Sequence, residues 1–297
     1  MNHLEIDPDA ARQYIDARAA FVACERAQAE AAQVRGGMVW KAVKGADYLV
    51  RTSASGGQKG MGVRTPETEQ VYERFQARKQ RATERLREAR ANVARHERLN
   101  RALRVGRMPN IAVDLLATLA DTGLHEHFRV VGTHALYAYE TAAGMRLDSR
   151  VTTTNDIDLL WDTRRRLVFA EQLARSAPSM LAVLQKVDKS FVLRPDQKYT
   201  AANDKGFEVD IIRREAVGGD PLTAPGFSEV VVGVNGRMAR LSTLHPGAFA
   251  AFKRWMAEQP DRDPLKRRRD ALQADAVAWL LQERLPQLQP QTAGPAA

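Results

Sequence analysis

The chain has 297 residues, of which 44% are hydrophobic and 27% are charged, and these proportions are ordinary for a globular protein with a sizeable core. The single cysteine, Cys24, excludes an intramolecular disulfide and a zinc site built from cysteines. No apolar run approaches the roughly 18 residues of a membrane span, and residues 1–7 lack a basic segment leading into an apolar one. We therefore expect a soluble, cytoplasmic protein with no membrane partner.

The net charge of +9 is distributed unevenly along the chain. Residues 1–109 contain 21 Lys and Arg against 13 Asp and Glu, whereas residues 110–297 contain 24 against 23. This asymmetry is typical of a module that faces a polyanion and is joined to a nearly neutral core. It is equally typical of a helical surface, rich in arginine, that faces only solvent.

Residues 1–109 are predicted to form a basic helical module with a small β-hairpin. Its elements are predicted in the following order: a helix over 8–34, strands over 38–41 and 47–51, a flexible loop over 53–62, and a second long helix over 65–105. Arginines recur on the second helix at steps of mostly three and four, at positions 74, 78, 81, 85, 95, 98 and 101. Arginines at this spacing share a broad face, which binds RNA or is simply solvated.

The glycine and proline of residues 106–109 mark the best domain boundary. Beyond it, helices are predicted over 111–122, 133–143, 163–187, 246–258 and 264–283, strands over 128–132, 154–161, 190–194, 206–213, 229–234 and 237–241, and a loop over 144–153. The interleaving of helices and strands favours an α+β core with a mixed sheet over 110–243, followed by C-terminal helices over 244–285. Residues 286–297 are rich in Pro and Gln, so we expect a disordered tail.

Residues 154–160 set two carboxylates, Asp156 and Asp158, one residue apart within an apolar run. Residues i and i+2 of a strand point to the same face, so the two carboxylates project together while the apolar residues between and after them enter the core. A later apolar strand over 207–212 contributes Asp210. Carboxylates on neighbouring strands are the ligands that Mg²⁺ or Mn²⁺ prefers, so we predict a metal site formed by the three aspartates.

Gly132 and Thr133 lie between a predicted strand and a predicted helix. A glycine lets the backbone approach phosphates, the start of the following helix offers free N–H groups, and Thr133 adds a hydroxyl. Nucleotidyl transfer needs in-line positioning and neutralisation of phosphate charge more than covalent help from the protein. The order of turn, paired carboxylates and later single carboxylate therefore favours a site for nucleotidyl transfer from an NTP.

These motifs resemble the nucleotidyltransferase superfamily that includes DNA polymerase beta, whose pattern is a Gly-[Gly/Ser] turn, an Asp-x-[Asp/Glu] strand and a later acidic strand. More narrowly, residues 131–136, 155–160 and 206–212 are similar to a bacterial nucleotidyltransferase-fold family of unassigned substrate, and residues 40–69 to its N-terminal module. The chain departs from the superfamily pattern in having threonine where Ser or Gly is commoner, and in the long interval before the paired aspartates. We expect an insertion near residues 144–148 to explain that interval.

The runs 252–255 and 266–270 resemble the lysine helix and the Arg-Asp helix of toxin-type nucleotidyltransferases related to abortive-infection systems. This resemblance implies that Lys253 and Asp270 border the nucleotide, with the lysine meeting the triphosphate. Alternatively, Lys253 lies on an ordinary amphipathic surface, and Asp270 pairs with a basic residue three or four positions earlier.

Other polar residues have weaker claims to a role. Lys198 and Lys205 flank the third carboxylate strand and are secondary candidates for phosphate binding. His134 follows the glycine turn, where a histidine satisfied within the first helical turn is commoner than a catalytic base. His125 and His127 have no third ligand nearby, so a loop is favoured over a zinc site.

We therefore expect an enzyme that moves an NMP from an NTP to an acceptor hydroxyl, with Asp156 and Asp158 holding the metals and Asp210 helping to deprotonate the acceptor. The basic N-terminal module makes RNA the preferred acceptor. The likeness to toxin-type enzymes implies a toxin that modifies tRNA and meets a protein partner or antitoxin. The alternative is a noncatalytic module that holds a nucleotide or nucleic acid on the same fold, and the presence of three carboxylates argues against it.

Overall fold

The computed structural model describes residues 4–162, 166–177, 179–197, 199–213 and 225–289. By contacts the chain divides into two compact units, a smaller one of Gln13–Leu99 and a larger one of Met1–Arg12 with Asn100–Ala297. None of the described helices is long and apolar enough to cross a membrane.

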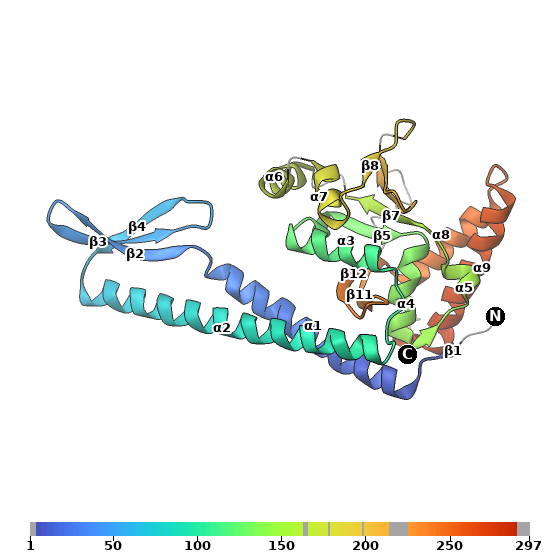
Figure 1. The fold of residues 1–297 in the computed structure, drawn as a ribbon, viewed down its shortest axis with the longest axis horizontal. Coiled ribbons are helices and arrows are strands. Elements are labelled where there is room, and N and C mark those ends of the chain that lie inside the picture. The colour runs from blue at the N-terminus through green and yellow to red at the C-terminus, as the bar shows by residue number, and fades with distance from the viewer. Residues whose placement is uncertain (1–3, 163–165, 178, 198, 214–224, 290–297) are drawn as a thin grey trace, which may run out of the picture. The chain divides into compact units, whose positions relative to one another are not determined.

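The smaller unit is a helical hairpin with a small sheet at its end (Figure 1). Its elements are α1 (Pro8–Gln33, whose first turn belongs to the larger unit), β2 (Gly37–Val43), β3 (Ala46–Thr52), β4 (Gln58–Val63) and α2 (Pro66–Ala102). The two helices are antiparallel, because Gln13 near the start of α1 contacts His96 near the end of α2, at 3.2 Å. At the other end Arg85 forms an ion pair with Glu30, at 3.2 Å.

Small buried residues form the seam between the two helices. On α1 the buried positions Ala17, Ala20 and Ala27 recur at steps of three and seven, which keeps them on one face. Ala82 on α2 is buried as well. The seam therefore contains small side chains, and Arg78, Arg81 and Arg85 of α2 are exposed.

The expected flexible loop over 53–62 is wrong in its second half, where β4 forms the third strand of the sheet β2-β3-β4. Every residue of β4 is exposed, so no alternation of apolar and polar residues signals the strand in the sequence. Gly60 and Gly62 interrupt its pattern further, and the pairing with β3 contains an irregularity between Leu49 and Val50. The predicted hairpin of β2 and β3 is confirmed.

The larger unit contains the remaining elements. They are β1 (Leu4–Glu5), α3 (Asn110–Asp121), β5 (Phe128–Val131), α4 (Leu136–Ala143), β6 (Met145–Arg146), α5 (Ser149–Thr152), β7 (Asp156–Trp161), α6 (Arg166–Ser176), α7 (Met180–Val187), β8 (Val192–Leu193), β9 (Thr200–Ala202), β10 (Glu208–Arg213), β11 (Gly226–Val232), β12 (Met238–Leu244), α8 (Pro246–Glu258) and α9 (Pro264–Glu283), with short 3-10 turns at His125–His127, Thr133–Ala135 and Pro286–Leu288.

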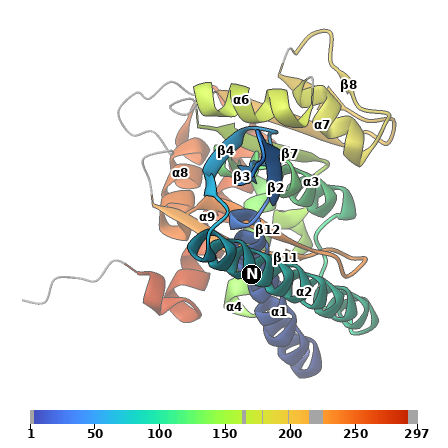
Figure 2. The same cartoon turned by 90° about the vertical axis from the view of Figure 1, so that its left-hand side faces the viewer.

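A five-stranded mixed sheet forms the centre of this unit, in the order β5-β7-β10-β9-β8. Strands β7 and β10 are parallel and the other neighbours are antiparallel, so the expected α+β class with a mixed sheet is confirmed. One face packs against α3 and α7, and the other against α4, α8 and α9 (Figure 1 and Figure 2). Ile157 and Leu159 of β7 are fully buried on the first face, as their alternation with the aspartates predicts.

The segments 1–12 and 100–109 belong to the larger unit in the division by contacts, whereas the sequence analysis assigned them to the N-terminal module. β1 pairs with β6 in the expected loop 144–153, and α5 follows in the same segment. The Asn100 side chain donates to the carbonyl of Gly236, at 3.2 Å. These long-range contacts, which no local pattern encodes, join both segments to the larger unit.

Two further differences concern short elements. β9 was not predicted, because its three residues carry no clear period. Pro286–Leu288, expected as the start of a disordered tail, form a 3-10 turn after Leu285, which is 2% exposed. Residues 290–297 of the expected tail lie outside the described residues.

Candidate active site

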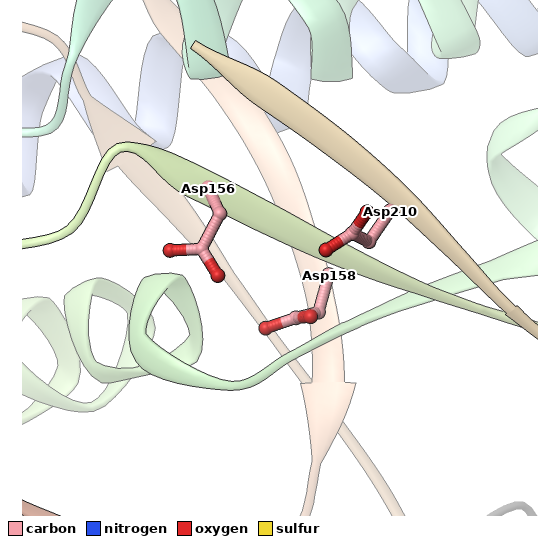
Figure 3. Close-up of side chains that lie close together, drawn as sticks. All are labelled: Asp156, Asp158 and Asp210. Carbon is pink, nitrogen blue, oxygen red and sulfur yellow. The ribbon is translucent and has the colours of Figure 1, made fainter. Parts of the chain in front are cut away.

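Asp156, Asp158 and Asp210 project together from two neighbouring strands (Figure 3). One ligand oxygen from each lies within 4.8 Å of the other two. The strand register explains the cluster, because β10 runs parallel to β7 with Asp210 opposite Asp158. The structure thus brings together the three carboxylates that the sequence predicts to share one face.

The electrostatics of this cluster favour a bound cation. Burial, followed by the negative charges of Asp156 and Asp210, raises the pKa of Asp158 to about 6. A divalent cation would relieve this repulsion, and three clustered carboxylate oxygens are a donor set that suits a hard cation such as Mg²⁺ or Mn²⁺. The residues present therefore fit the predicted metal.

Two threonine hydroxyls fix the rotamers of the outer aspartates. Thr154 donates to Asp156, and Thr200 on β9 donates to Asp210 at 2.5 Å. Each hydroxyl occupies one carboxylate oxygen and leaves the other oxygen of that carboxylate to a further ligand. The sequence analysis singled out neither threonine. Thr200 could not be found because β9 was not predicted and its pairing with β10 depends on the fold.

The Gly132 turn lies directly against the carboxylate cluster. Gly132 has φ +67° and ψ −153°, a conformation essentially restricted to glycine. A Cβ at this position would clash with the Asp158 carboxylate. Thr133 follows in a 3-10 turn and is 5% exposed, and its Oγ1 accepts a hydrogen bond from Gln273 Nε2 on α9, at 3.1 Å. The predicted turn is therefore adjacent to the predicted carboxylates.

His134, which follows the glycine turn, contacts the backbone of strand β7. Its Nδ1 donates to the carbonyl of Asp156, at 2.9 Å, since a carbonyl can only accept. Burial lowers the pKa of His134 to about 4, so the ring is neutral at physiological pH. A neutral, fully buried ring that hydrogen-bonds to the backbone fits a structural role better than a role as catalytic base.

Lys253 and Asp270 form a buried ion pair between α8 and α9, at 2.7 Å. Lys253 is 6% exposed and Asp270 is 1% exposed, so the alternative of an amphipathic surface is wrong for Lys253. The second oxygen of Asp270 accepts from Arg262 at 2.9 Å, whereas the sequence suggested a partner three or four positions earlier in the helix. Burial lowers the pKa of Lys253, and the charges of Asp270 and Asp158 oppose that shift. Lys253 thus lies close to the carboxylate cluster.

The remaining candidates do not join the cluster. Lys205 is exposed and pairs with Asp188 at 3.5 Å, and Lys198 lies outside the described residues. His127 is buried and its Nε2 contacts the Gln172 side chain at 2.5 Å. Within the described part of the chain, the aspartate triad is the one group with the composition and spacing of a metal site.

Gln273 and Arg269 lie beside the candidate site, and the sequence analysis did not single them out. Gln273 is fully buried and donates to the Val151 carbonyl at 2.8 Å as well as to Thr133. Arg269 is near enough to Asp158 for its positive charge to lower the pKa of that carboxyl. Their positions on one helix were a usable signal, since Gln273 lies three residues after Asp270 and four after Arg269, and residues at these spacings share a face.

Comparison with known families adds an independent observation. Residues 110–223 and 221–294 match the family described as Nucleotidyltransferase. The chain belongs to this nucleotidyltransferase family. The match contains the carboxylate triad, the Gly132 turn and both C-terminal helices, and it excludes the smaller unit of the chain. No curated protein matches the chain, and no solved structure matches it.

Family membership supports the general chemistry, and the geometry supplies a candidate location for it. A nucleotidyltransferase acts on a nucleoside triphosphate, and enzymes of this kind typically use divalent cations. The aspartate triad is the group that can bind such a cation here. The chain is therefore a member of a transferase family with a cluster of carboxylates suited to metal-assisted phosphoryl chemistry.

Proposed function

We propose that the protein is a metal-dependent nucleotidyltransferase that transfers an NMP from an NTP to a hydroxyl group of RNA. The observation that supports this most strongly is the aspartate triad, whose ligand oxygens lie within 4.8 Å of one another, beside a glycine turn that only glycine can form. A divalent cation held by the triad would neutralise charge on the triphosphate and stabilise the departing pyrophosphate.

The proposed reaction is a single displacement. The acceptor oxygen attacks the α-phosphorus and forms a new P–O bond, while the bond from the α-phosphorus to the bridging oxygen breaks. The electron pair of that bond leaves with pyrophosphate. Asp210 accepts the acceptor proton on the carboxylate oxygen that Thr200 leaves free, and then releases it to solvent.

Each remaining site residue has a proposed role in binding the nucleotide. Asp156 and Asp158 hold the cation, and the backbone of Gly132 and Thr133 lies against the phosphates. Lys253 neutralises triphosphate charge, in keeping with its proximity to Asp158. Asp270 is the partner that keeps Lys253 in position, since the two form a buried ion pair.

RNA is proposed as the acceptor because of the charge of the smaller unit. Gln13–Leu99 contain 17 Lys and Arg against 10 Asp and Glu, and so contribute +7 of the total +9. Arg78, Arg81 and Arg85 are exposed on α2. A toxin that modifies tRNA ends and is held by an antitoxin is the most concrete version, and its support is the likeness of the α8 and α9 motifs to toxin-type enzymes.

A labelling experiment tests this proposal. The protein is incubated with each α-labelled NTP, Mg²⁺ and separated fractions of total cellular RNA, protein and small molecules, with the Asp158→Asn variant as control. We expect label in RNA with the wild-type protein and none with the variant. Label in protein or a small molecule would contradict RNA as acceptor. Binding of NTP without any transfer would favour the noncatalytic module instead.

A further inference from the structure

One turn of α9 presents three polar side chains toward the carboxylate cluster, namely Arg269, Asp270 and Gln273. Gln273 holds the Thr133 hydroxyl of the glycine turn. Asp270 holds Lys253, whose charge reaches Asp158. Arg269 precedes Asp270 and lies one turn before Gln273, so it shares this helix face. This turn of α9 therefore lies beside the cluster.

Basic side chains engage both carboxylate oxygens of Asp270. One of its oxygens accepts from Lys253 at 2.7 Å and the other accepts from Arg262 at 2.9 Å. It is 1% exposed, so the two cations enclose it. Asp270 neutralises one of those two charges, and its role is to position Lys253.

Arg269 differs from its basic neighbours in having an unfilled hydrogen-bonding capacity. Its Nε is buried and has no acceptor among the described residues. An arginine carries five donors in a planar fork, and a shielded donor without an acceptor costs free energy. The adjacent Arg268 is exposed to solvent and has no such constraint. Arg269 is therefore a partly buried cation with one buried donor that no described group accepts.

The charge balance of the site identifies the chemistry of that partner. In the metal-free cluster the charge of Arg269 acts on Asp158. A divalent cation held by the three aspartates would neutralise most of their negative charge. An NTP carries its α-phosphate to the reaction centre. The negative charge of its two terminal phosphates needs further cationic groups, in addition to the metal that the triad would hold. A guanidinium fork binds phosphate oxygens in pairs and is the side chain best suited to this task.

We propose that Arg269 binds the two terminal phosphates of the NTP and then the pyrophosphate that leaves, while Asp270 positions Lys253 and binds no ligand. This inference rests on the proposed function and names the residue that distinguishes a triphosphate from a monophosphate. Arg269 stays protonated throughout, and no proton or covalent bond passes through it. The electron pair of the broken P–O bond goes to pyrophosphate, whose added charge Arg269 stabilises.

The test compares Arg269→Gln with Arg268→Gln, which removes the same charge from the next, exposed position. Calorimetry measures the affinity for an α,β-methylene NTP, which cannot be cleaved at that bond, in the presence of Mg²⁺. It also measures the affinity for the corresponding NMP under the same conditions. For Arg269→Gln we expect triphosphate affinity to fall by about 10- to 100-fold, the effect of removing a charge-assisted contact, with NMP affinity within about twofold of wild type. Arg268→Gln should bind both ligands as the wild type does.

The possible failures are distinguishable. Equal triphosphate affinity for Arg269→Gln and wild type would overturn this inference and leave the proposed function standing. No triphosphate binding by the wild-type protein would overturn both. If Arg269→Gln does not fold, Arg269→Lys keeps the charge but not the fork, and we expect it to bind the triphosphate more weakly while binding NMP normally. Wild-type triphosphate affinity in that variant would contradict a role for the fork.

Discussion

The position of Asp158 in the fold disfavours the charged form that its proposed role requires. Burial and two neighbouring carboxylates disfavour its ionised form, which is the form that binds a metal. Gly132 adds to the crowding, because its backbone lies so close that a Cβ would clash with the Asp158 carboxylate. Ionisation of Asp158 therefore costs free energy in the metal-free protein, and a bound cation would offset that cost.

Replacing Asp158 by Asn should stabilise the metal-free protein above pH 6. The folded-state pKa is raised from near 4 to about 6, so the cost of ionisation is absent below pH 4, grows as the pH rises, and is complete above about pH 6. The variant should gain roughly 1–3 kcal/mol in unfolding free energy at pH 8 and almost nothing at pH 4. Urea denaturation with EDTA at both pH values measures this difference.

Added Mg²⁺ provides the control for that prediction. It should stabilise the wild-type protein at pH 8 and stabilise the Asp158→Asn variant much less, because the cation needs the carboxylate. A variant that is less stable than the wild type at pH 8 without metal would contradict the account of repulsion at this residue.

The buried pair of Lys253 and Asp270 should respond asymmetrically to mutation. Asp270→Asn leaves two cations, Lys253 and Arg262, without their shared anion and should cost about 3 kcal/mol of stability. Lys253→Met leaves Asp270 still paired with Arg262, so its cost in stability should be smaller while its effect on NTP affinity is larger. Urea denaturation and nucleotide titration of both variants check this order, and a reversed order in stability would contradict it.

At the scale of elements, β7 and β10 were predictable because their signal is local. Apolar and acidic residues alternate within each strand, and the period of two decides which side chains of a strand share a face. The parallel register that sets Asp210 opposite Asp158 depends on the fold. β4 was not predictable, since an exposed strand containing Gly60 and Gly62 has no apolar alternation. The partners of Asp270 were not predictable either, because they depend on how α8 and the following loop pack against α9.

The contact between α9 and the glycine turn gives a prediction at the same scale. Gln273→Leu keeps the volume but removes both donors, to Thr133 and to the Val151 carbonyl, and should cost about 1–2 kcal/mol of stability. Because the Thr133 hydroxyl then loses its fixed orientation, turnover should fall as well. Steady-state kinetics and denaturation test both effects, with Leu272→Met on the same helix as a volume-matched control. Unchanged turnover in Gln273→Leu would show that catalysis does not depend on the hydrogen bond between Gln273 and Thr133.

At the scale of the whole molecule, charge separates the two units. The family match covers the larger unit, whereas most of the net positive charge lies on the smaller one. If the arginines of α2 bind RNA, affinity should fall steeply with salt, because each neutralised phosphate releases condensed counterions. Reversing Arg78, Arg81 and Arg85 to Glu should reduce the slope of log affinity against log salt by about one per lost contact.

A matched variant keeps this test specific. Reversing Arg175, Lys186 and Lys189, which are exposed on the larger unit, changes the net charge equally and should leave most of the salt dependence intact. Equal effects of the two triple variants would mean that only total charge matters. Weak, salt-insensitive binding by the wild-type protein would show that α2 is a solvated surface, and the acceptor would then be a protein or a small molecule.

Transfer activity of the aspartate variants tests the central claim most directly. Release of pyrophosphate and labelling of the acceptor are followed for the wild type, Asp156→Asn, Asp158→Asn and Asp210→Asn, each shown by circular dichroism to be folded. We predict Mg²⁺-dependent transfer by the wild type, its loss in the first two variants, and a fall in turnover larger than any loss of NTP binding in Asp210→Asn. Wild-type turnover in any folded variant of the triad would contradict the assignment of this cluster as the active site.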